Sequence, residues 1–438
     1  MSLRSSTAAD TALWQSADRH LVRYGHFFQP AIIEKASGSF MTTTDGRRLL
    51  DFASGQMSTI LGHSHPEITA TIREQAGELV HLYSQLLSRP VIALAEKLAE
   101  IAPGALDRVL LLSTGGESNE AALRMAKTAT GGYEVLALSR SWHGVTHGAA
   151  SVTYNSSRSG HGPAAPGSFV LPAPTPYRPR FMNGDSYDWL GELDYGFELF
   201  DRQSTGNPAA LIVESIFSSG GVVVPPDGYL KAAAERARAR GMLVIVDEAQ
   251  TGLGRTGVMF DCARDGFVPD LLTLSKTLGA GLPLSAVITT QDIEQRCFDK
   301  KFHFYTTHAS DPLPAAVGLK VIEIILRDRL ADRARVAGER LARGFETLQQ
   351  RFEPIGDVRG RGLMMGVELV TDRRSKTPAP ELAQRVMNRC LDLGLSTSII
   401  RGSWGVFRIA PPITITDEEI DLGLSIFEKA LSAELDRR

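Results

Sequence analysis

The sequence has few of the features that mark secreted, membrane-bound or nucleic-acid-binding proteins. Its three cysteines, Cys262, Cys297 and Cys390, are far apart and fit neither a disulfide framework nor a zinc site. No apolar stretch approaches the roughly 18 residues of a membrane span, and no run of lysine and arginine occurs. The N-terminal segment lacks the apolar core of a secretory signal. We therefore expect a cytoplasmic protein that binds neither membranes nor nucleic acid.

Short apolar runs alternate with helical patterns in the middle of the chain. Helical patterns such as 117–127 and 229–240 lie between several of these runs. Continuous apolar strands separated by helices indicate an α/β fold whose mostly parallel sheet is covered on both faces. The predicted strands are 109–112, 135–138, 211–213, 243–246 and 271–274.

The pattern changes past about residue 314, where long amphipathic helices and short strands near 363–369 and 406–409 follow. A length of 438 residues suits one large domain and a smaller one. We expect the large domain over 61–315, a small α+β domain over 316–438, and an N-terminal segment, 1–60, that packs with the small domain. The Pro- and Gly-rich stretch 160–183 is expected to be a long ordered loop.

An acid and a lysine follow two of the predicted strands, at the edge where open α/β sheets place ligands. Asp247 fits either the Walker B acid of an ATPase, for which no G-x-x-x-x-G-K-[ST] loop occurs, or an acid paired with a pyridine nitrogen. Lys276 is either a solvated strand end or an amine whose pKa is lowered in a partly dry site, so that it forms an imine. About thirty residues apart, the two fit a pyridoxal phosphate (PLP) site.

Two further motifs fit such a cofactor. STGGESNEAA follows the strand 109–112 and opens a helix, so Gly115 and Gly116 let backbone amides approach a phosphate, although a plain strand–helix turn also explains them. Trp142, in SWHG, is either a core residue or a flat face that stacks on a pyridine ring. His143 beside it is expected to be a hydrogen-bonded neighbour of the site.

Two other patterns are rejected as ligand sites. The glycines of 252–257 match G-x-G-x-x-G, but the following Val-Met-Phe-Asp-Cys does not form the amphipathic helix that a dinucleotide site needs. His63 and His65 lie close together, but no further ligand for zinc is evident.

The strings STGGESNEAA, SWHG, VDEAQTGLGRTG and LSKTLGAGLP resemble those of the class III (ω-type) aminotransferases, of PLP-dependent transferase fold type I. The resemblance covers nearly the whole chain. It implies that Lys276 carries PLP as a Schiff base and that the protein is a homodimer or a dimer of dimers. The other implied cofactor contacts are Asp247 on the pyridine nitrogen, Gln250 near the ring hydroxyl, Trp142 on the ring, Gly115 and Gly116 at the phosphate, and Thr307 of the neighbouring subunit.

Within this family the sequence is most similar to the 2,2-dialkylglycine decarboxylases. Gln56 matches the residue beside the scissile carboxylate, and Arg408, in FRIAPP, matches the arginine that holds a substrate carboxylate. Met57, Trp142 and Ser219 complete the implied substrate site. The implied reaction converts 2,2-dialkylglycines such as 2-aminoisobutyrate to a ketone and carbon dioxide, and the amino group passes to pyruvate to give alanine. The implied catalytic residues are Lys276, Asp247, Gln56 and Trp142.

The segment YTTHASDPLP has a second implication. A carboxylate, a hydroxyl and several backbone carbonyls suit a hard cation. The resemblance implies an alkali metal ion, potassium or sodium, bound by Leu82, Ser84, Thr307, Ala309 and Asp311. Without the resemblance, Asp311 before a proline is interpreted as a helix N-cap, and the two roles are compatible.

Several positions depart from the decarboxylase pattern. Gly116 stands in place of an alanine, Ser215 in place of a proline, and the stretch 397–405, with Arg401, is shorter and different. The alternative is a non-decarboxylating class III aminotransferase that acts on amines, ω-amino acids or branched amino acids with the same lysine, acid and arginine. The intact residue set argues against a PLP-binding protein without turnover. The missing phosphate loop argues against an ATPase.

Overall fold

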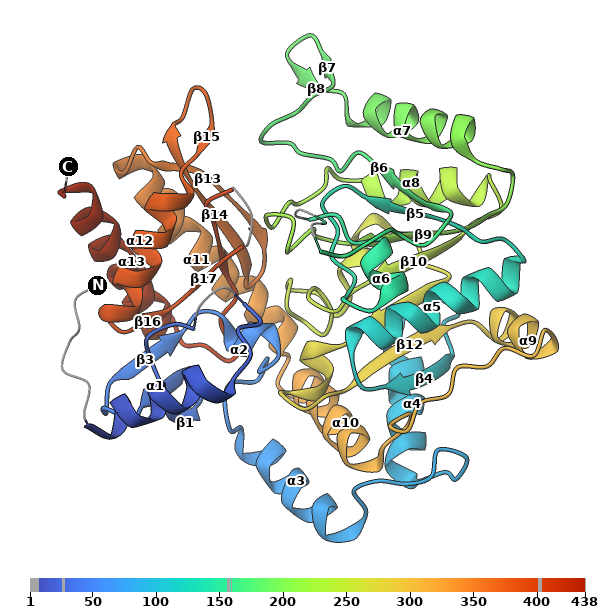
Figure 1. Ribbon diagram of the computed structural model, residues 1–438, viewed down its shortest axis with the longest axis horizontal. Helices are drawn as coiled ribbons and strands as arrows, with labels where there is room; N and C mark the ends of the chain where they lie inside the picture. Colours follow the sequence, from blue (N-terminus) through green and yellow to red (C-terminus); the bar gives the residue numbers. More distant parts are fainter. Residues whose placement is uncertain (1–7, 26–27, 156–157, 159, 401–403, 438) are drawn as a thin grey trace.

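The computed structural model describes residues 8–25, 28–155, 158, 160–400 and 404–437. Figure 1 shows two parts side by side, a larger one around a twisted sheet and a smaller one where the N- and C-terminal segments meet. None of the described helices is long and apolar enough to cross a membrane. The three cysteines are buried and form no disulfide.

A seven-stranded sheet forms the centre of the larger part. Its strand order is β4-β12-β11-β10-β9-β5-β6, and only β12 runs antiparallel to its neighbours. The sheet is therefore mostly parallel, as the α/β prediction requires. The strands are β4 (Arg108–Leu112), β5 (Glu134–Leu138), β6 (Ser168–Leu171), β9 (Pro208–Glu214), β10 (Leu243–Asp247), β11 (Leu271–Leu274) and β12 (Ser285–Thr289).

Alternate residues of these strands pack into two separate cores, one on each face of the sheet. In β9, for example, Ala210 and Ile212 belong to one core, whereas Leu211 and Val213 belong to the other. Burial on both faces explains why the strands are continuous apolar runs rather than alternating ones.

Helices cover both faces of the sheet (Figure 1). Helix α5 packs on one face and α8 on the other, while α10 packs against α3 and α4. The helices of this part are α3 (Pro66–Glu78), α4 (Arg89–Ile101), α5 (Gly115–Thr130), α6 (His147–Ser151), α7 (Trp189–Gln203), α8 (Tyr229–Arg238), α9 (Gln291–Asp299) and α10 (Pro312–Arg327), with 3₁₀ turns η1 (Asp261–Asp265) and η2 (Lys276–Gly279).

Two details of this part differ from the sequence-based expectation. Strand β12 is buried and antiparallel, because the short turn η2 rather than a helix connects it to β11. The stretch 160–183 is not loop throughout, since β6 forms the parallel edge of the sheet and β7 (Met182–Asn183) pairs with β8 (Ser186–Tyr187).

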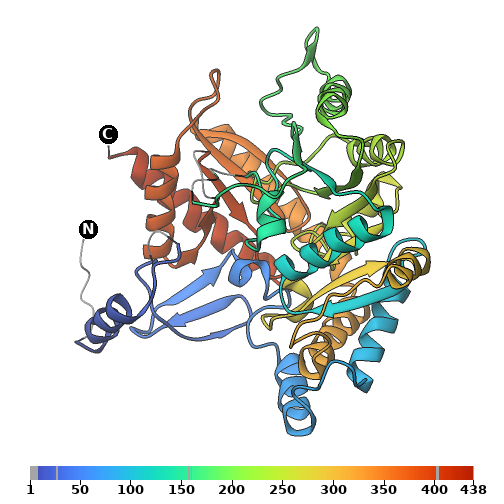
Figure 2. The same cartoon turned by 45° about the vertical axis from the view of Figure 1, so that its right-hand side comes forward.

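The smaller part combines segments from both ends of the chain (Figure 2). Strand β3 pairs in parallel with β16, and β14 lies between β13 and β18. The domain boundaries at residues 60 and 315 stay a prediction. The elements are α1 (Ala8–His20), β1 (Ile33–Ser37), β2 (Phe40–Thr43), β3 (Arg48–Asp51), α2 (Ser54–Met57), α11 (Leu330–Arg351), β13 (Ile355–Arg361), β14 (Met364–Asp372), β15 (Thr377–Pro378), α12 (Pro380–Asp392), β16 (Leu395–Ser396), β17 (Ser398–Ile399), β18 (Val406–Ile409) and α13 (Asp417–Leu435).

Candidate active site

A cavity of about 370 Å³ lies at the carboxyl ends of the parallel strands. Strands β10 and β11 pair so that Asp247 stands opposite Thr273, and Lys276 follows three residues later. The acid and the lysine therefore meet at one edge of the sheet, as their positions in the sequence predict. Six of the predicted site residues line the cavity: Gly115, Gly116, Trp142, Asp247, Gln250 and Lys276.

Three groups hold the carboxylate of Asp247, which is buried. Its Oδ2 accepts from Asn119 Nδ2 at 2.8 Å and lies 2.9 Å from His143 Nδ1, and its Oδ1 accepts from the amide of Ala249 at 3.0 Å. Burial works to raise the pKa of Asp247, but the hydrogen bond and charge of His143 and the charge of Lys276 hold it below its ordinary value. Asp247 is thus an anion in the wall of the cavity.

Asn119 belongs to the motif STGGESNEAA, but the sequence did not indicate a role for it. It lies in α5, donates to both Asp247 and the carbonyl of His143, and accepts from Thr273 Oγ1 at 2.8 Å. A buried amide that satisfies three groups on three elements fixes their relative positions.

Lys276 begins the turn η2 in a left-handed conformation with φ of 35°. Burial lowers the pKa of its ammonium group and Arg408 adds to this, whereas Asp247 and Glu214 oppose the shift. Ser58 Oγ donates to the carbonyl of Lys276 at 3.1 Å. A lysine with a lowered pKa and a strained backbone at a cavity wall suits a reacting amine.

The glycine motif forms a cradle at the N-terminus of α5. Thr114 caps the helix in a capping box with Glu117, and the amides of Gly115 and Gly116 have no acceptor among the described residues. A Cβ on Gly115 would lie 2.8 Å from Ser275 Oγ. The open amides and the helix dipole favour an anion such as phosphate.

Trp142 and Glu214 form a second wall of the cavity. The amide of Trp142 donates to Glu214 Oε1 at 2.8 Å, and the indole lines the cavity. Burial and the negative charge of Asp247 raise the pKa of Glu214 well above its usual range, so this carboxyl group favours its neutral form.

Gln250 connects the cavity to Arg408. Its Oε1 accepts from Ser218 Oγ at 2.8 Å and from Arg408 Nη1 at 3.2 Å. Arg408 itself does not line the cavity, and burial lowers its pKa while Glu214 opposes the shift. The guanidinium makes no ion pair with a carboxylate among the described residues, so it keeps donors for an anionic ligand.

Gln56 and Met57 lie on a short left-handed turn, since φ is positive at all four residues of α2. Met57 is buried against Ile216, which lines the cavity, whereas the side chain of Gln56 is exposed. Gln56 is two residues from Ser58 in the cavity wall. Its predicted contact with a substrate carboxylate stays a prediction.

Arg255 lies within the glycine motif that was rejected as a dinucleotide site, and its side chain supports this turn. Its side chain is fully buried and donates to Ser54 Oγ at 3.2 Å and to the carbonyls of Leu363 and Pro411. Burial lowers its pKa to about 9. Gly254 and Gly257 meanwhile allow close packing against Ala331 and Arg335 of α11.

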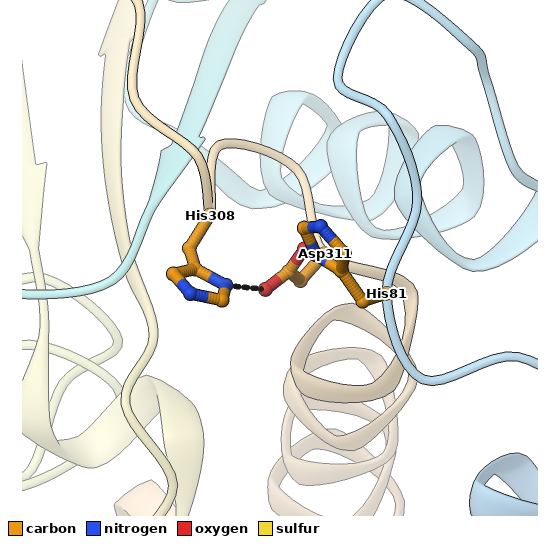
Figure 3. Close-up of side chains that lie close together, drawn as sticks. All are labelled: His81, His308 and Asp311. Carbon is orange, nitrogen blue, oxygen red and sulfur yellow. Dashed lines mark hydrogen bonds and ion pairs between the residues drawn. The ribbon is translucent and has the colours of Figure 1, made fainter.

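The proposed alkali metal ligands lie outside the cavity. Figure 3 shows His308 pointing to Asp311. The Nδ1 atoms of His308 and His81 lie 2.7 and 2.6 Å from the two carboxylate oxygens of Asp311. Asp311 occupies the N-cap position of α10, as predicted, although its side chain makes no capping hydrogen bond and its two oxygens contact the imidazoles instead. A carboxylate has about four lone-pair positions, so two remain for a hard cation.

The segments that hold the other predicted metal ligands lie side by side, since His81 contacts both Asp311 and His308. Leu82 and Ser84 are partly buried, Ala309 is buried, and Thr307 is exposed. An exposed Thr307 is compatible with a contact to a neighbouring subunit. Ser219 lies one residue from Ser218, and Arg401 lies outside the described residues.

The residues present fit PLP. The cavity combines an acid, a lysine, an aromatic face and an anion cradle, which match the ring nitrogen, aldehyde, ring face and phosphate of that cofactor. His143 Nε2 and Thr251 Oγ1 are buried in its wall without a partner among the described residues, so the cavity has unmet polar groups for a ligand.

Comparisons with known proteins show the family of this chain. The family model of Aminotransferase class-III matches residues 22–431. An uncharacterized aminotransferase of Schizosaccharomyces pombe is 51% identical over 422 residues, which cover 96% of this chain and 94% of that protein. The diaminobutyrate–2-oxoglutarate aminotransferase of Rhizobium meliloti is 33% identical over 90% of this chain and 86% of its own. A crystal structure of a Bacillus anthracis aminotransferase has a TM-score of 0.91 and 27% identity, and covers 98% of this chain and 100% of that chain.

Proposed function

We propose that this chain, which belongs to the class III aminotransferase family, transfers the amino group of an amino acid or amine to a 2-oxo acid without loss of carbon dioxide. The observation that carries the proposal is the meeting of Lys276 and the anionic, triply held Asp247 in one cavity. PLP, when bound, supplies an electron-accepting ring that stabilises negative charge on the substrate carbon.

The residues of the chain have separate roles in this proposal. Gly115 and Gly116 bind the phosphate through their amides, and Trp142 covers the ring. Asp247 holds a proton on the ring nitrogen. Lys276, whose pKa is lowered by burial, would carry the proton between the substrate carbon and the cofactor. Arg408 binds a carboxylate of the amino or 2-oxo acid.

The relatives support amino transfer rather than decarboxylation. The name of the diaminobutyrate–2-oxoglutarate aminotransferase of Rhizobium meliloti contains an amino acid with a second amino group and a 2-oxo acid. The Schizosaccharomyces pombe relative, at 51% identity, is named as an aminotransferase. The decarboxylation of 2,2-dialkylglycines is therefore the second candidate. Gln56, two residues from the cavity wall, is the observation that favours it.

A single-turnover comparison separates the two candidates. The PLP form is mixed with L-alanine, with an amine, or with 2-aminoisobutyrate, which has no α-hydrogen. Cofactor absorbance and carbon dioxide are followed. We expect conversion of the cofactor to its amine form by a donor with an α-hydrogen and no carbon dioxide. Release of carbon dioxide from 2-aminoisobutyrate at a comparable rate would make decarboxylation the function.

The alkali metal ion and the homodimer are part of the same proposal. Asp311, held by two imidazoles, would bind potassium or sodium with oxygens of Thr307, Ala309, Leu82 and Ser84. Potassium should then raise the melting temperature of the wild type and not that of Asp311→Asn. Sedimentation of the holoenzyme should give a dimer or tetramer, and a monomer would contradict a phosphate site shared through Thr307.

A further inference from the structure

Arg140 is a charged residue that the proposed reaction does not use; it does not line the cavity itself but precedes the lining residue Trp142 in the chain. It lies two residues before Trp142, so the two Cα atoms are at most about 7.6 Å apart. Its guanidinium stacks on the ring of Trp404, with Cζ 4.0 Å from the ring centroid. Its Nη1 donates to the carbonyl of Gly220 at 3.1 Å. The side chain is thus held in place by contacts that leave its charge without a counterion.

The nearby acids are already engaged. Glu368 pairs with Arg178 at 2.6 Å and with Arg359 at 2.8 Å. Within the described part of the chain, Arg140 makes no ion pair and directs one of its five N–H donors to a protein acceptor. It is only partly buried, so the remaining donors can meet a ligand.

The surroundings of Arg140 favour an anion. Burial lowers its pKa to about 10, and the positive charge of Arg359 adds to this lowering. Both effects disfavour the charged guanidinium. A bound anion would oppose both, because it supplies the missing opposite charge.

The turn 218–220 contacts both Arg140 and Gln250, the residue to which Arg408 donates. Ser218 and Arg408 donate to the same amide oxygen, that of Gln250 in the cavity wall. Gly220, two residues later, accepts from Arg140. Arg140 is therefore bonded to this turn directly, whereas Arg408 is linked to it through the side chain of Gln250.

Ser219 is the tip of this turn. It is partly exposed, whereas the other residues of 215–223 are buried. Gly220 has to be a glycine, since a Cβ there would lie 2.3 Å from the carbonyl oxygen of Arg140.

We propose that Arg140 is a specificity-determining residue that binds a second anionic group of the amino acceptor, so that the preferred acceptors are dicarboxylic 2-oxo acids. The inference rests on the amino transfer proposed above. Arg408 binds the carboxylate beside the oxo group, and Arg140 binds the distal carboxylate by charge-assisted hydrogen bonds. Trp404 orients the guanidinium by stacking.

The test compares acceptors that differ at the distal end alone. The cofactor of the holoenzyme is first converted to its amine form. The enzyme is then mixed with 2-oxoglutarate or with 2-oxopentanoate, which has a methyl group in place of the distal carboxylate. Arg140→Gln should lower kcat/KM for 2-oxoglutarate by about 10- to 100-fold, mainly through KM, and change that for 2-oxopentanoate less than about twofold. Arg140→Lys should recover part of the loss, because it keeps the charge without the planar fork.

The control is Arg180→Gln, which removes a positive charge near Arg140 from an exposed side chain. It should leave the ratio of the two kcat/KM values within about twofold. Trp404→Leu should selectively lower kcat/KM for 2-oxoglutarate, by a smaller factor than Arg140→Gln.

Each other outcome has a definite meaning. An equal loss with both acceptors in Arg140→Gln would assign Arg140 a structural role and overturn the proposal. Arg140-dependent use of O-phosphoethanolamine as donor, without dependence on 2-oxoglutarate, would overturn the acceptor assignment and identify a phosphate subsite. If the wild type aminates no 2-oxo acid, the proposed function fails first. If it aminates 2-oxopentanoate as well as 2-oxoglutarate, only the subsite fails.

Discussion

The Nδ1 of His143 lies 2.9 Å from the Oδ2 of Asp247, and both side chains are buried. This pair joins the loop after β5 to the end of β10, and Asn119 of α5 donates to the same oxygen. The acid at the bottom of the cavity is therefore held by two elements besides its own strand. Its ionisation depends on these neighbours as much as on its own position.

The first prediction concerns this pair. The hydrogen bond from His143 is the main effect that lowers the pKa of Asp247, so His143→Ala should raise it. The active carboxylate is present above its pKa and is lost as the pH falls through it. The acid limb of kcat/KM against pH should therefore move to higher pH in His143→Ala. His143→Gln, whose amide can still donate, should stay closer to the wild type. Superimposable acid limbs would refute the assignment.

The second prediction concerns the phosphate cradle. Gly144 has φ of 139°, and a Cβ on it would lie 2.9 Å from the Cα of Gly116. Gly144→Ala should push the cradle apart and weaken PLP binding by about tenfold or more, as measured by titration of the apoenzyme. Gly160→Ala is the control, since its φ is also positive but nothing lies within 4 Å. Equal PLP affinity in both variants would contradict the cradle.

The third prediction concerns pH and stability. Glu248 is fully buried, and its burial beside Asp261 raises its pKa to about 7, compared with roughly 4.3 in an unfolded chain. The folded state thus binds the proton more tightly. Its contribution to the free energy of unfolding is present below the unfolded pKa and is lost as pH rises to about 7. The fall in melting temperature from about pH 5 to about pH 8 should be smaller in Glu248→Gln than in the wild type. The control variant Glu198→Gln, at an exposed position, should behave like the wild type. A fall in melting temperature that is unchanged in Glu248→Gln would contradict the raised pKa of Glu248.

The fourth prediction concerns Arg408. Its guanidinium reaches the cavity through Gln250 and has no carboxylate partner among the described residues. Arg408→Gln should lower kcat/KM for donors with a carboxylate by about 10- to 100-fold, because a charge-assisted pair is lost. An amine without a carboxylate should change by less than about threefold in the same half-reaction. Equal losses with both donors would assign Arg408 to the cofactor site.

Much of the larger part could be predicted from the sequence, because burial on both faces of a parallel sheet produces continuous apolar runs. All five predicted strands occur, at most a few residues longer, and Lys276 and Asp247 stand at the expected edge. Strand β12 was not among the predicted strands. A five-residue run directly after a turn also does not indicate whether the strand is parallel or antiparallel to its neighbour. The antiparallel pairing follows from the shortness of η2, which is a property of the folded chain.

The groups that support the site were less accessible to sequence reasoning. Asn119 is one polar residue in an amphipathic helix, and its contact with Asp247 joins residues 128 positions apart. Arg255 is a buried cation whose partners are backbone carbonyls, and such a role has no sequence pattern. Arg140 acquires its importance from Trp404, which lies more than 260 positions later. Long-range contacts of this kind are set by the fold rather than by local spacing.

The same applies to Asp311, where a residue before a proline was interpreted as an N-cap. Asp311 does occupy that position, but its two oxygens contact His81 and His308 and accept no hydrogen bond from the helix amides. One of them, His81, comes from a distant segment and could not be paired with Asp311 from the sequence.

The most direct test of the account is reduction of the holoenzyme with borohydride, followed by peptide mapping. The account predicts that PLP becomes fixed to a single peptide, at Lys276, and that Lys276→Ala binds PLP but fixes none. Lys127→Ala, which removes another lysine whose pKa burial lowers, is the control and should be labelled like the wild type. Cofactor fixed at one site in Lys276→Ala, or at a different lysine in the wild type, would contradict the central claim.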